Sequence, residues 1–277
     1  MTYKIISDSS SDIQHLDGVD YASVPLKIIT DEKEYVDDEA LNVEEMVSDL
    51  LKYKGASKSS CPNAGEWQQA FGEAENVFCV TITSGLSGSC NAANMALSEH
   101  LEKYPEKKGY VVDTLSAGPE NALIVEKLRD LIAEKLNFDE IVKKINLYKE
   151  KTHLLFTLES LRNLANNGRV SGAVAKITGI LDIRVVGKAS SEGTLEVLSK
   201  VRGCKKALAE LVKQMLKNGY NGGKVRIHHC QNVESAKNLS QQILSLFPKA
   251  SVVISETRAL CSFYAEAGGL LVGYESL

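Results

Sequence analysis

Hydroxyl and glycine residues gather in one short stretch of the chain, TSGLSGS at residues 83–89. The apolar, β-branched run Val77–Thr83 leads into it and helix-forming residues follow, which predicts a strand, a turn and a helix. The first turn of such a helix has unpaired backbone N–H groups and the positive end of the helix dipole. The glycines allow close approach to the backbone, and the hydroxyls of Ser84, Ser87 and Ser89 are further donors. The stretch is therefore suited to hold an anion.

Two interpretations of this turn need little or no chemistry from the serines. Capping alone would explain the residue types, because serine is favoured at helix starts and glycine in turns. A dinucleotide site would need G-x-G-x-x-G and an acid about 20 residues further on. The chain has only Gly85-x-x-Gly88 of that pattern, although Asp113 ends the next predicted strand. The match to a nucleotide-binding turn is therefore partial.

Two further interpretations use the hydroxyl groups directly. A serine hydrolase would need G-x-S-x-G with Ser87 as nucleophile, and Ser89 stands where the second glycine belongs. Asp113 and then His228 or His229 would supply the acid and the base in the expected order. Alternatively, the turn holds a carboxylate or a phosphate that is never transformed, which requires donors but no activated base. Residue types and spacing leave all four interpretations open.

A second hydroxyl cluster lies in GASKSSCPNAGEW, residues 55–67. Pro62 stands just before a predicted helix start at Asn63 or Ala64, so Ser59 and Ser60 are expected in an extended loop. Ligands of α/β proteins bind where the loops at the carboxyl ends of the strands meet. The two serine-rich loops are therefore expected to converge, although a polar surface loop would have the same composition.

Composition excludes several classes of protein. The chain has 277 residues, 44% apolar and 25% charged, which is enough for one large or two ordinary domains with a real core. Its formal net charge is −4, its pI is about 5.8 and it has a single tryptophan. A basic footprint and an aromatic-plus-basic stripe are both missing, so nucleic acid is not an expected partner.

Cysteine spacing and hydropathy bear on location and on metals. The six cysteines form no CxxC pair and no Cys/His cluster with zinc spacing. No signal peptide is recognisable, and no apolar run approaches the roughly 20 residues that span a bilayer. We expect a cytoplasmic protein with reduced thiols, no integral membrane segment, no metal and no cofactor.

Strand-like and helix-like segments alternate along the chain. Strands are predicted at Tyr3–Ser7, Ala22–Ile29, Val77–Thr83, Tyr110–Asp113, His153–Thr157, Ile183–Gly187, Thr194–Leu198, Val225–His229, Val252–Ser255 and Leu270–Tyr274. Helices are predicted at Val43–Tyr53, Gly65–Phe71, Asn91–Glu102, Glu120–Lys135, Asp139–Lys149, Lys205–Lys217 and Val233–Phe247. Such alternation is typical of an α/β fold built from βαβ units.

The two halves of this pattern differ. Up to about residue 150 the segments repeat as strand, turn and helix, which predicts a Rossmann-like domain with a parallel sheet. Further on, Ile183–Gly187 and Thr194–Leu198 are joined by a Gly/Ser-rich turn, which predicts an antiparallel hairpin. We therefore predict two α/β domains, residues 1–150 and 151–277, the second with a mixed or antiparallel sheet.

Six motifs together resemble one known family. They are ISDSSSDI (residues 6–13), SKSSCP (57–62), TSGLSGSCNAA (83–93), LRNLANNGRVS (161–171), KVRGCKKAL (200–208) and HHCQNVESA (228–236). In order and spacing they resemble the DegV family of bacterial fatty-acid-binding proteins, the lipid-carrying subunit of bacterial fatty acid kinase. The resemblance runs the whole length of the chain.

The resemblance implies a long-chain fatty acid, such as palmitate or stearate, held between the two domains. The acyl chain would lie in an apolar tunnel and the carboxylate at the hydroxyl loops. By position, Ser59 takes the place of the family's loop threonine and Ser87 that of the second serine of its turn. Arg169 matches the family arginine near the head group, although a surface arginine at a helix end would look the same.

Neighbouring residues complete the ligand-binding set that the resemblance implies. Ser60 adjoins Ser59, and Ser84 and Gly88 belong to the same turn as Ser87. A fatty acid kinase catalytic subunit would phosphorylate the bound acid, so the chain itself is expected to be a carrier and not an enzyme. The alternative is an esterase with Ser87 as its nucleophile.

The chain departs from the family pattern in two places. Cys61 stands where the family usually has glutamine. CSFYAEAGGLLVGY (residues 261–274) replaces the family's C-terminal Thr-His-x-Gly-Pro-Gly stretch, and Tyr264 aligns near the missing histidine. A tyrosine donates a hydrogen bond but stays neutral near pH 7. We expect lipid binding to survive this exchange more readily than use by a conventional kinase.

Overall fold

The computed structural model describes residues 2–171 and 182–276. Its N-terminal half is built on a parallel sheet of four strands in the order β2-β1-β6-β7. The strands are β1 (Tyr3–Asp8), β2 (Asp20–Val24), β6 (Asn76–Thr81) and β7 (Lys108–Asp113). Every residue of β6 is buried, as expected for a central strand that is covered on both faces.

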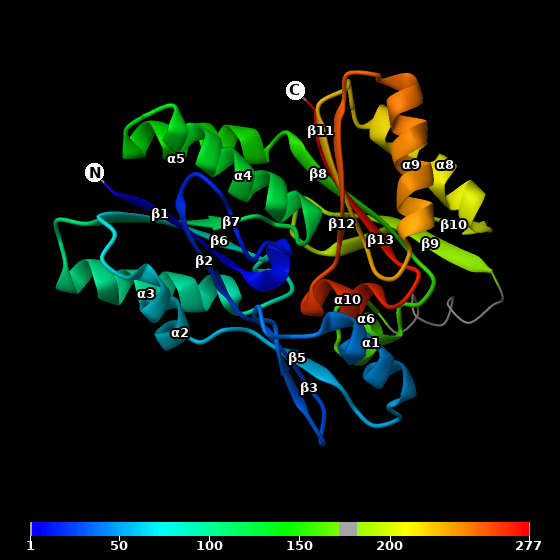
Figure 1. Ribbon diagram of the computed structural model, residues 1–277, viewed down its shortest axis with the longest axis horizontal. Coiled ribbons are helices and arrows are strands. Elements are labelled where there is room, and N and C mark those ends of the chain that lie inside the picture. Colours follow the sequence, from blue (N-terminus) through cyan, green and yellow to red (C-terminus); the bar gives the residue numbers. More distant parts are fainter. Residues whose placement is uncertain (1, 172–181, 277) are drawn as a thin grey trace.

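Helices cover both faces of this parallel sheet (Figure 1). On one face lie α2 (Ala64–Phe71) and α3 (Ser89–Lys103), which pack on the strands through Trp67, Phe71, Ala93, Ala96 and Leu97. On the other face lie α4 (Pro119–Ala133) and α5 (Phe138–Lys149), whose buried residues pack on Ile5, Phe78 and Val80. This three-layer arrangement is the Rossmann-like half that the alternating pattern predicts.

A small antiparallel sheet branches from this half. Its strands, in the order β4-β3-β5, are β3 (Lys27–Ile29), β4 (Glu34–Val36) and β5 (Lys58–Ser60), and α1 (Val43–Lys52) connects β4 to β5. The predicted single strand Ala22–Ile29 is wrong, because Pro25 separates β2 from β3. Proline has no N–H for a ladder and fixes its own φ, so a strand is interrupted there. Ser59 and Ser60 also lie in a strand and not in a loop.

The C-terminal half is built on a sheet of six strands in the order β10-β9-β8-β13-β11-β12. The strands are β8 (Thr152–Leu158), β9 (Ile183–Ala189), β10 (Leu195–Arg202), β11 (Lys224–His229), β12 (Ser251–Glu256) and β13 (Leu270–Glu275). Only the β11–β12 pair is parallel, so the sheet is mixed. The predicted α/β fold, with a parallel sheet first and a mixed sheet second, is confirmed.

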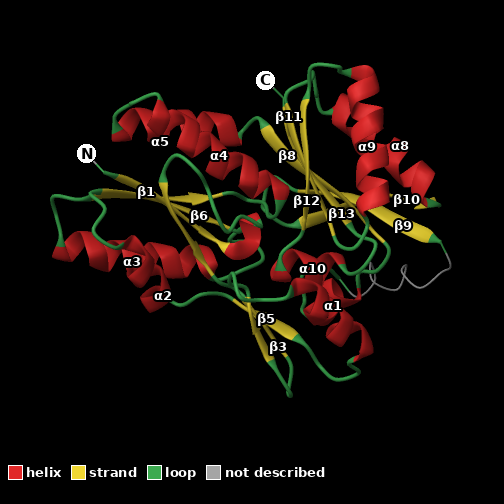
Figure 2. Cartoon of the chain, in the orientation of Figure 1, coloured by secondary structure: helices red, strands yellow, loops and turns green. Residues whose placement is uncertain are grey.

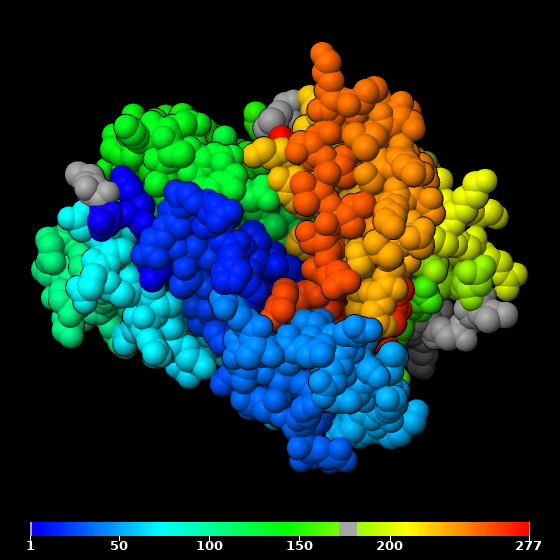
Figure 3. Space-filling view, viewed as in Figure 1, coloured from blue at the N-terminus to red at the C-terminus, as the bar shows by residue number. Residues whose placement is uncertain are grey.

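Helices cover both faces of the mixed sheet, and the N-terminal half meets it on one of them (Figure 2). One face packs on α8 (Cys204–Lys217) and α9 (Val233–Leu246), whereas α4 of the N-terminal half also contacts β8, β11 and β13. Arg226 on β11 forms an ion pair of 2.6 Å with Glu126 of α4. In the space-filling view, blue residues of the N-terminal half and orange residues of the C-terminal half adjoin along a continuous border (Figure 3).

One hydrophobic cluster contains residues of both halves. It joins Leu26, Ile28 and Ile82 to residues of β8, of α6 (Arg162–Asn166) and of α10 (Ala259–Ala265). The boundary expected at residues 150 and 151 falls between α5 and β8, and the division into two domains stays a prediction. Among the described residues, no helix has both the length and the apolar character needed to cross a bilayer.

Candidate functional site

A cavity of about 300 Å³ lies between the two halves. Its wall on the mixed sheet is formed by Leu154, Phe156 and Leu158, which alternate along β8 and therefore project from one face. The rest of the apolar wall is formed by Leu26, Ile82, Leu86, Ala117, Leu164, Leu195, Leu260, Cys261, Ala265 and Leu271. The cavity is suited to an apolar chain.

Hydroxyl groups from three separate elements reach this cavity. Ser59 and Ser60 come from β5, Ser87 from the turn before α3, and Tyr264 from α10. The oxygens Ser59 Oγ and Tyr264 Oη are 2.7 Å apart, although the residues are 205 positions apart in the chain. The structure thus places Ser59, Ser87 and Tyr264 around one cavity. In the sequence, only the family resemblance had connected these three residues.

Further contacts show that these polar groups form one patch. Arg169 lies in the cavity wall, and its Nε donates to the carbonyl oxygen of Leu86 at 3.3 Å, next to Ser87. Gly88 also lines the cavity, and a Cβ at that position would lie 3.3 Å from Sγ of Cys61. The serine turn, β5 and Arg169 therefore surround the same part of the cavity.

The three serines of the turn face different surroundings. Ser87 is half-buried at the cavity, and its Oγ accepts the backbone N–H of Ser89 at 3.3 Å. Ser84 is exposed and does not line the cavity, because its backbone N–H donates to Oδ1 of Asp113 at 3.1 Å and holds the residue outside. Ser84 thus lies apart from the other residues of the expected ligand-binding set, and its part in binding stays a prediction.

The start of α3 holds a carboxylate that belongs to the chain itself. Ser89 is buried, and its Oγ donates to Oδ2 of Asp8 at 2.6 Å. The same oxygen accepts the backbone N–H of Ile82 at 2.9 Å. Burial raises the pKa of Asp8, while hydrogen bonds from Ser10, Ser89 and Ile82 act to lower it. Part of the anion-holding capacity of the turn is therefore used internally.

The first glycine of the turn is explained by protein packing and not by a ligand. A Cβ on Gly85 would lie only 2.9 Å from the carbonyl oxygen of Gly193, at the tip of the hairpin between β9 and β10. The hydroxyl of Thr83 donates to that same carbonyl at 2.8 Å. Gly85 thus allows the C-terminal half to approach the turn closely.

The structure does not assemble the triad of a serine hydrolase. His228 Nδ1 lies 2.7 Å from Oδ2 of Asp12, and Nδ1 of His229 accepts the backbone N–H of Asn232. Asp113 accepts backbone N–H groups of the nearby loops. Among the described residues, the cavity wall contains no Asp, Glu or His, so Ser87 has no candidate general base there.

The polar patch is electrostatically suited to an anion. Arg169 supplies a positive charge in the wall. Burial raises the pKa of Tyr264, opposed by its hydrogen bond with Ser59 and by the charge of Arg169, so the phenol remains a neutral donor. The part of the chain that the structure describes has no group of three His, Cys, Asp or Glu residues that could hold a metal.

Sequence reasoning missed the apolar wall and the helix that carries Tyr264. Alternation in THLLFTL of β8 was a usable signal for the wall, because every second residue projects to one face. Helix α10 has only seven residues, too few for a helical period to stand out. The partner of Tyr264 on β5 had no local signal.

Comparison with protein families gives a match over nearly the whole chain. A family model described as "Uncharacterised protein, DegV family" matches residues 2–276. A DegV domain-containing protein of Streptococcus pneumoniae is 45% identical, over 99% of this chain and 99% of its own. A DegV domain-containing protein of Streptococcus pyogenes serotype M1 is 44% identical, over 99% and 100% of the two chains.

Solved structures of similar proteins contain fatty acids. The Streptococcus pneumoniae Fatty Acid Kinase (Fak) B3 protein, loaded with linoleic acid, is 45% identical over 100% of both chains, with a TM-score of 0.98. A DegV family protein from Eubacterium eligens, loaded with heptadecanoic acid, is 41% identical over 100% of both chains, also with a TM-score of 0.98. A DegV family protein from Ruminococcus gnavus, refined with vaccenic acid, is 30% identical over 98% and 99%, with a TM-score of 0.91.

Proposed function

The chain belongs to the DegV family, and from that premise we propose that it is a carrier of a long-chain fatty acid. The acyl chain occupies the cavity between the halves, and the carboxylate is held by the hydroxyls of Ser59 and Ser87. Palmitate and stearate are the ligands of first choice, and unsaturated acids of similar length are included because relatives carry linoleic and vaccenic acid.

One observation carries the proposal: an apolar cavity whose polar patch offers hydroxyls and a guanidinium but, among the described residues, no acid or base. Burying a carboxylate without hydrogen bonds is very costly, so a site for one must supply donors. A hydrogen bond to a charged group contributes roughly 1.5–3 kcal/mol. The patch supplies several such donors where an acyl chain would end.

The bond between Ser59 and Tyr264 shapes the head-group site. One hydroxyl of this pair donates to the other, which leaves a single proton of the pair for a ligand. Together with the hydroxyl of Ser87, the carboxylate would receive at least two hydrogen bonds. Ser60 and Gly88 lie beside these donors, and Arg169 adds a favourable charge.

The protein itself performs no bond chemistry in this proposal. With no general base in the described wall, a fatty acid kinase catalytic subunit would bring the phosphoryl donor to the bound carboxylate. The carrier needs no metal or other cofactor. Six unpaired cysteine thiols suit the reducing cytoplasm, where we place it.

Native mass spectrometry of protein purified from a bacterial host tests the proposal. We expect a mass increment equal to one long-chain fatty acid, and uptake of palmitate or stearate by the delipidated protein. A fluorophosphonate should leave Ser87 unlabelled. Absence of any fatty acid together with no uptake, or labelling of Ser87 with esterase turnover, would replace the carrier with another function.

A further inference from the structure

Two carboxylates bracket a single tight turn at the end of β1. Asp8 is the N-cap of the 3₁₀ helix η1 (Ser9–Ser11), and Asp12 is its C-cap, with φ at +59°. The side chain of Asp12 is 0% exposed and Asp8 is fully buried. Neither carboxylate lines the cavity, so neither contacts a ligand there.

Asp8 holds both ends of the loop that carries Ser87. Its Oδ2 accepts Ile82 N–H at 2.9 Å before the loop and Ser89 Oγ–H at 2.6 Å after it. Its Oδ1 accepts the backbone N–H and the hydroxyl of Ser10, which anchors the carboxylate to η1. One buried carboxylate therefore ties down the loop that positions Ser87 at both of its ends.

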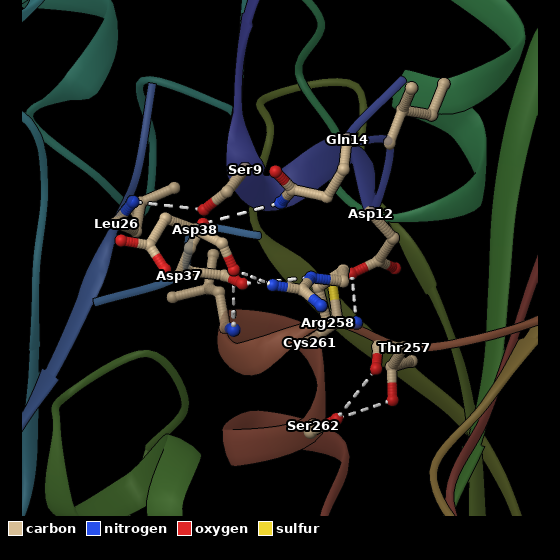
Figure 4. Close-up of polar contacts among 12 residues, drawn as sticks. Ser9, Asp12, Gln14, Leu26, Asp37, Asp38, Thr257, Arg258, Cys261 and Ser262 are labelled. Atoms are coloured by element: carbon tan, nitrogen blue, oxygen red, sulfur yellow. Dashed lines mark hydrogen bonds and ion pairs between the residues drawn. The ribbon is translucent and has the colours of Figure 1, made fainter. Parts of the chain in front are cut away.

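Asp12 holds the helix that carries Tyr264. Its Oδ1 accepts the backbone N–H of Arg258, the N-cap of α10, at 2.7 Å, and its Oδ2 lies 2.7 Å from Nδ1 of His228. Figure 4 shows Asp12 beside Arg258, whose guanidinium points toward Asp37 on the other side. Since α10 presents Tyr264 to Ser59, Asp12 sets the second part of the head-group patch.

Other atoms of η1 hold two further pieces of the cavity wall. The carbonyl oxygen of Ser10 accepts the N–H of Gly118 at 2.8 Å, next to Ala117 in the wall. The hydroxyl of Ser9 accepts the N–H of Leu26 at 3.0 Å, and Leu26 is itself in the wall. The turn thus connects pieces of both halves around the cavity.

We propose that Asp8 and Asp12 are positioning residues for the bound carboxylate. Asp8 aligns Ser87 and Asp12 aligns Tyr264 with Ser59, so that donors from three elements converge on one head group. The inference rests on the proposed carrier function and deepens it. Its specific consequence is that the two aspartates control affinity for the carboxylate and leave affinity for the acyl chain nearly unchanged.

The experiment compares palmitate with its methyl ester in Asp8→Asn and Asp12→Asn. In Asp8→Asn, one carboxylate oxygen becomes an NH2 group, which cannot accept a hydrogen bond. The backbone N–H that faces it, of either Ser10 or Ile82, therefore loses its acceptor. We expect each variant to bind palmitate roughly 10-fold more weakly, as for the loss of one hydrogen bond to a charge. Affinity for the ester, which has the same chain but no charge, should stay within about twofold.

Glu275→Gln is the matched control. Glu275 is a buried carboxylate that accepts Tyr148 Oη–H at 2.7 Å and Lys224 N–H at 2.8 Å, and it is not part of the cavity wall. Its substitution should lower the melting temperature without changing the ratio of the affinity for palmitate to the affinity for its methyl ester. Ser89→Ala is a milder variant that removes one donor from Asp8 and keeps the charge, with a ratio lowered about threefold.

A double variant tests whether Asp8 acts through Ser87. Asp8→Asn should add little to the loss caused by Ser87→Ala, because both remove the same aligned donor. Fully additive losses, or an unchanged ratio in Asp8→Asn, Asp12→Asn and Ser89→Ala alike, would overturn the inference while the carrier function stands. Wild-type protein that binds neither palmitate nor its ester would overturn the carrier function and this inference with it.

Discussion

Two clusters of hydroxyl groups in this protein differ in whether the chain itself supplies the carboxylate to which they can donate. Around Asp8, the hydroxyls of Ser10 and Ser89 are buried and already donate to a carboxylate of the chain. Around the cavity, Ser59, Ser87 and Tyr264 are half-buried and no carboxylate of the described chain lies among them. A cluster that is complete within the chain is structural, and one that lacks its acceptor beside an apolar cavity is a candidate site.

The comparison is sharpest within a single turn. Ser87 and Ser89 are two residues apart, yet one lines the cavity and the other donates to Asp8. Gly88, the N-cap residue of α3, lies between them and has no side chain to cap the helix. The serine on either side of it can therefore face a different part of the molecule. Composition of a turn therefore does not reveal which of its hydroxyls a ligand would use.

The largest effect is expected from Asp8→Ala, which removes the acceptor of the complete cluster. Two backbone N–H groups and two hydroxyls would lose their buried partner. Since breaking a buried charged network costs about 3–5 kcal/mol, the free energy of unfolding in urea should fall by about that much. A loss below about 1 kcal/mol would show that this cluster is not structural.

Glu120 offers the opposite case, a buried carboxylate with fewer donors. Its Oε1 accepts Thr152 Oγ1–H at 2.7 Å, and burial raises its pKa to about 7. A carboxyl whose pKa is raised on folding stabilises the folded state at a pH below its unfolded pKa. For Glu120, this stabilisation is lost as the pH rises from about 4.5 to about 7. At pH 8, Glu120→Gln should therefore be more stable than wild type by about 2–3 kcal/mol, with little difference at pH 4.

Unfolding in urea at the two pH values measures this difference. Asp8→Asn serves as the contrast, because four donors converge on this carboxylate and the NH2 of an amide would displace at least one of them at either pH. An equal effect of Glu120→Gln on the free energy of unfolding at pH 4 and pH 8 would show that the pKa of Glu120 is not raised on folding.

In the incomplete cluster, Ser59→Ala and Ser87→Ala should affect binding and spare the fold. Each removes a donor to a charged group, worth roughly 1.5–3 kcal/mol, so palmitate should bind about 10- to 100-fold more weakly. The double variant should lose less than the sum, because both donors share one ligand group and water can replace them. Calorimetric titration beside melting curves gives both quantities.

The reverse pattern would assign Ser87 to the fold. Its Oγ accepts Ser89 N–H at 3.3 Å, which is a weak local contact. If this contact were its main role, stability would fall by about 1 kcal/mol and palmitate affinity would be unchanged.

The smallest effect is expected from Tyr264→Phe. Ser59 would lose its bond to the phenol but could then donate its own proton to the carboxylate, so affinity should fall only about three- to tenfold. Use by a conventional fatty acid kinase is expected to be poor in the wild type, because the family resemblance aligns this tyrosine near a histidine of the family pattern. Efficient phosphorylation that Tyr264→Phe leaves unchanged would contradict that expectation.

Local patterns predicted most of the elements and failed where the reason was not local. Val77–Thr83 corresponds to β6 (Asn76–Thr81), and the predicted helix Asp139–Lys149 to α5 (Phe138–Lys149). The alternation of elements was enough for the fold class, because amphipathic segments have few ways to bury their apolar faces. The short strands β4 and β5 and the helix α10 were missed, since three to seven residues carry no clear period.

By itself, the sequence determined the α/β fold, the two serine-rich segments and their family resemblance. Only the tertiary structure decided that Ser89 belongs to Asp8, 81 positions away, and that Ser59 belongs to Tyr264, 205 positions away. It also decided that Ser84 lies outside the cavity wall and that Gly193 approaches Gly85 too closely for a side chain there. Whether a hydroxyl is satisfied within the chain depends on residues that tertiary packing brings near, within one half for Ser89 and between the two halves for Ser59. Propensity and periodicity report only the nearest neighbours along the chain.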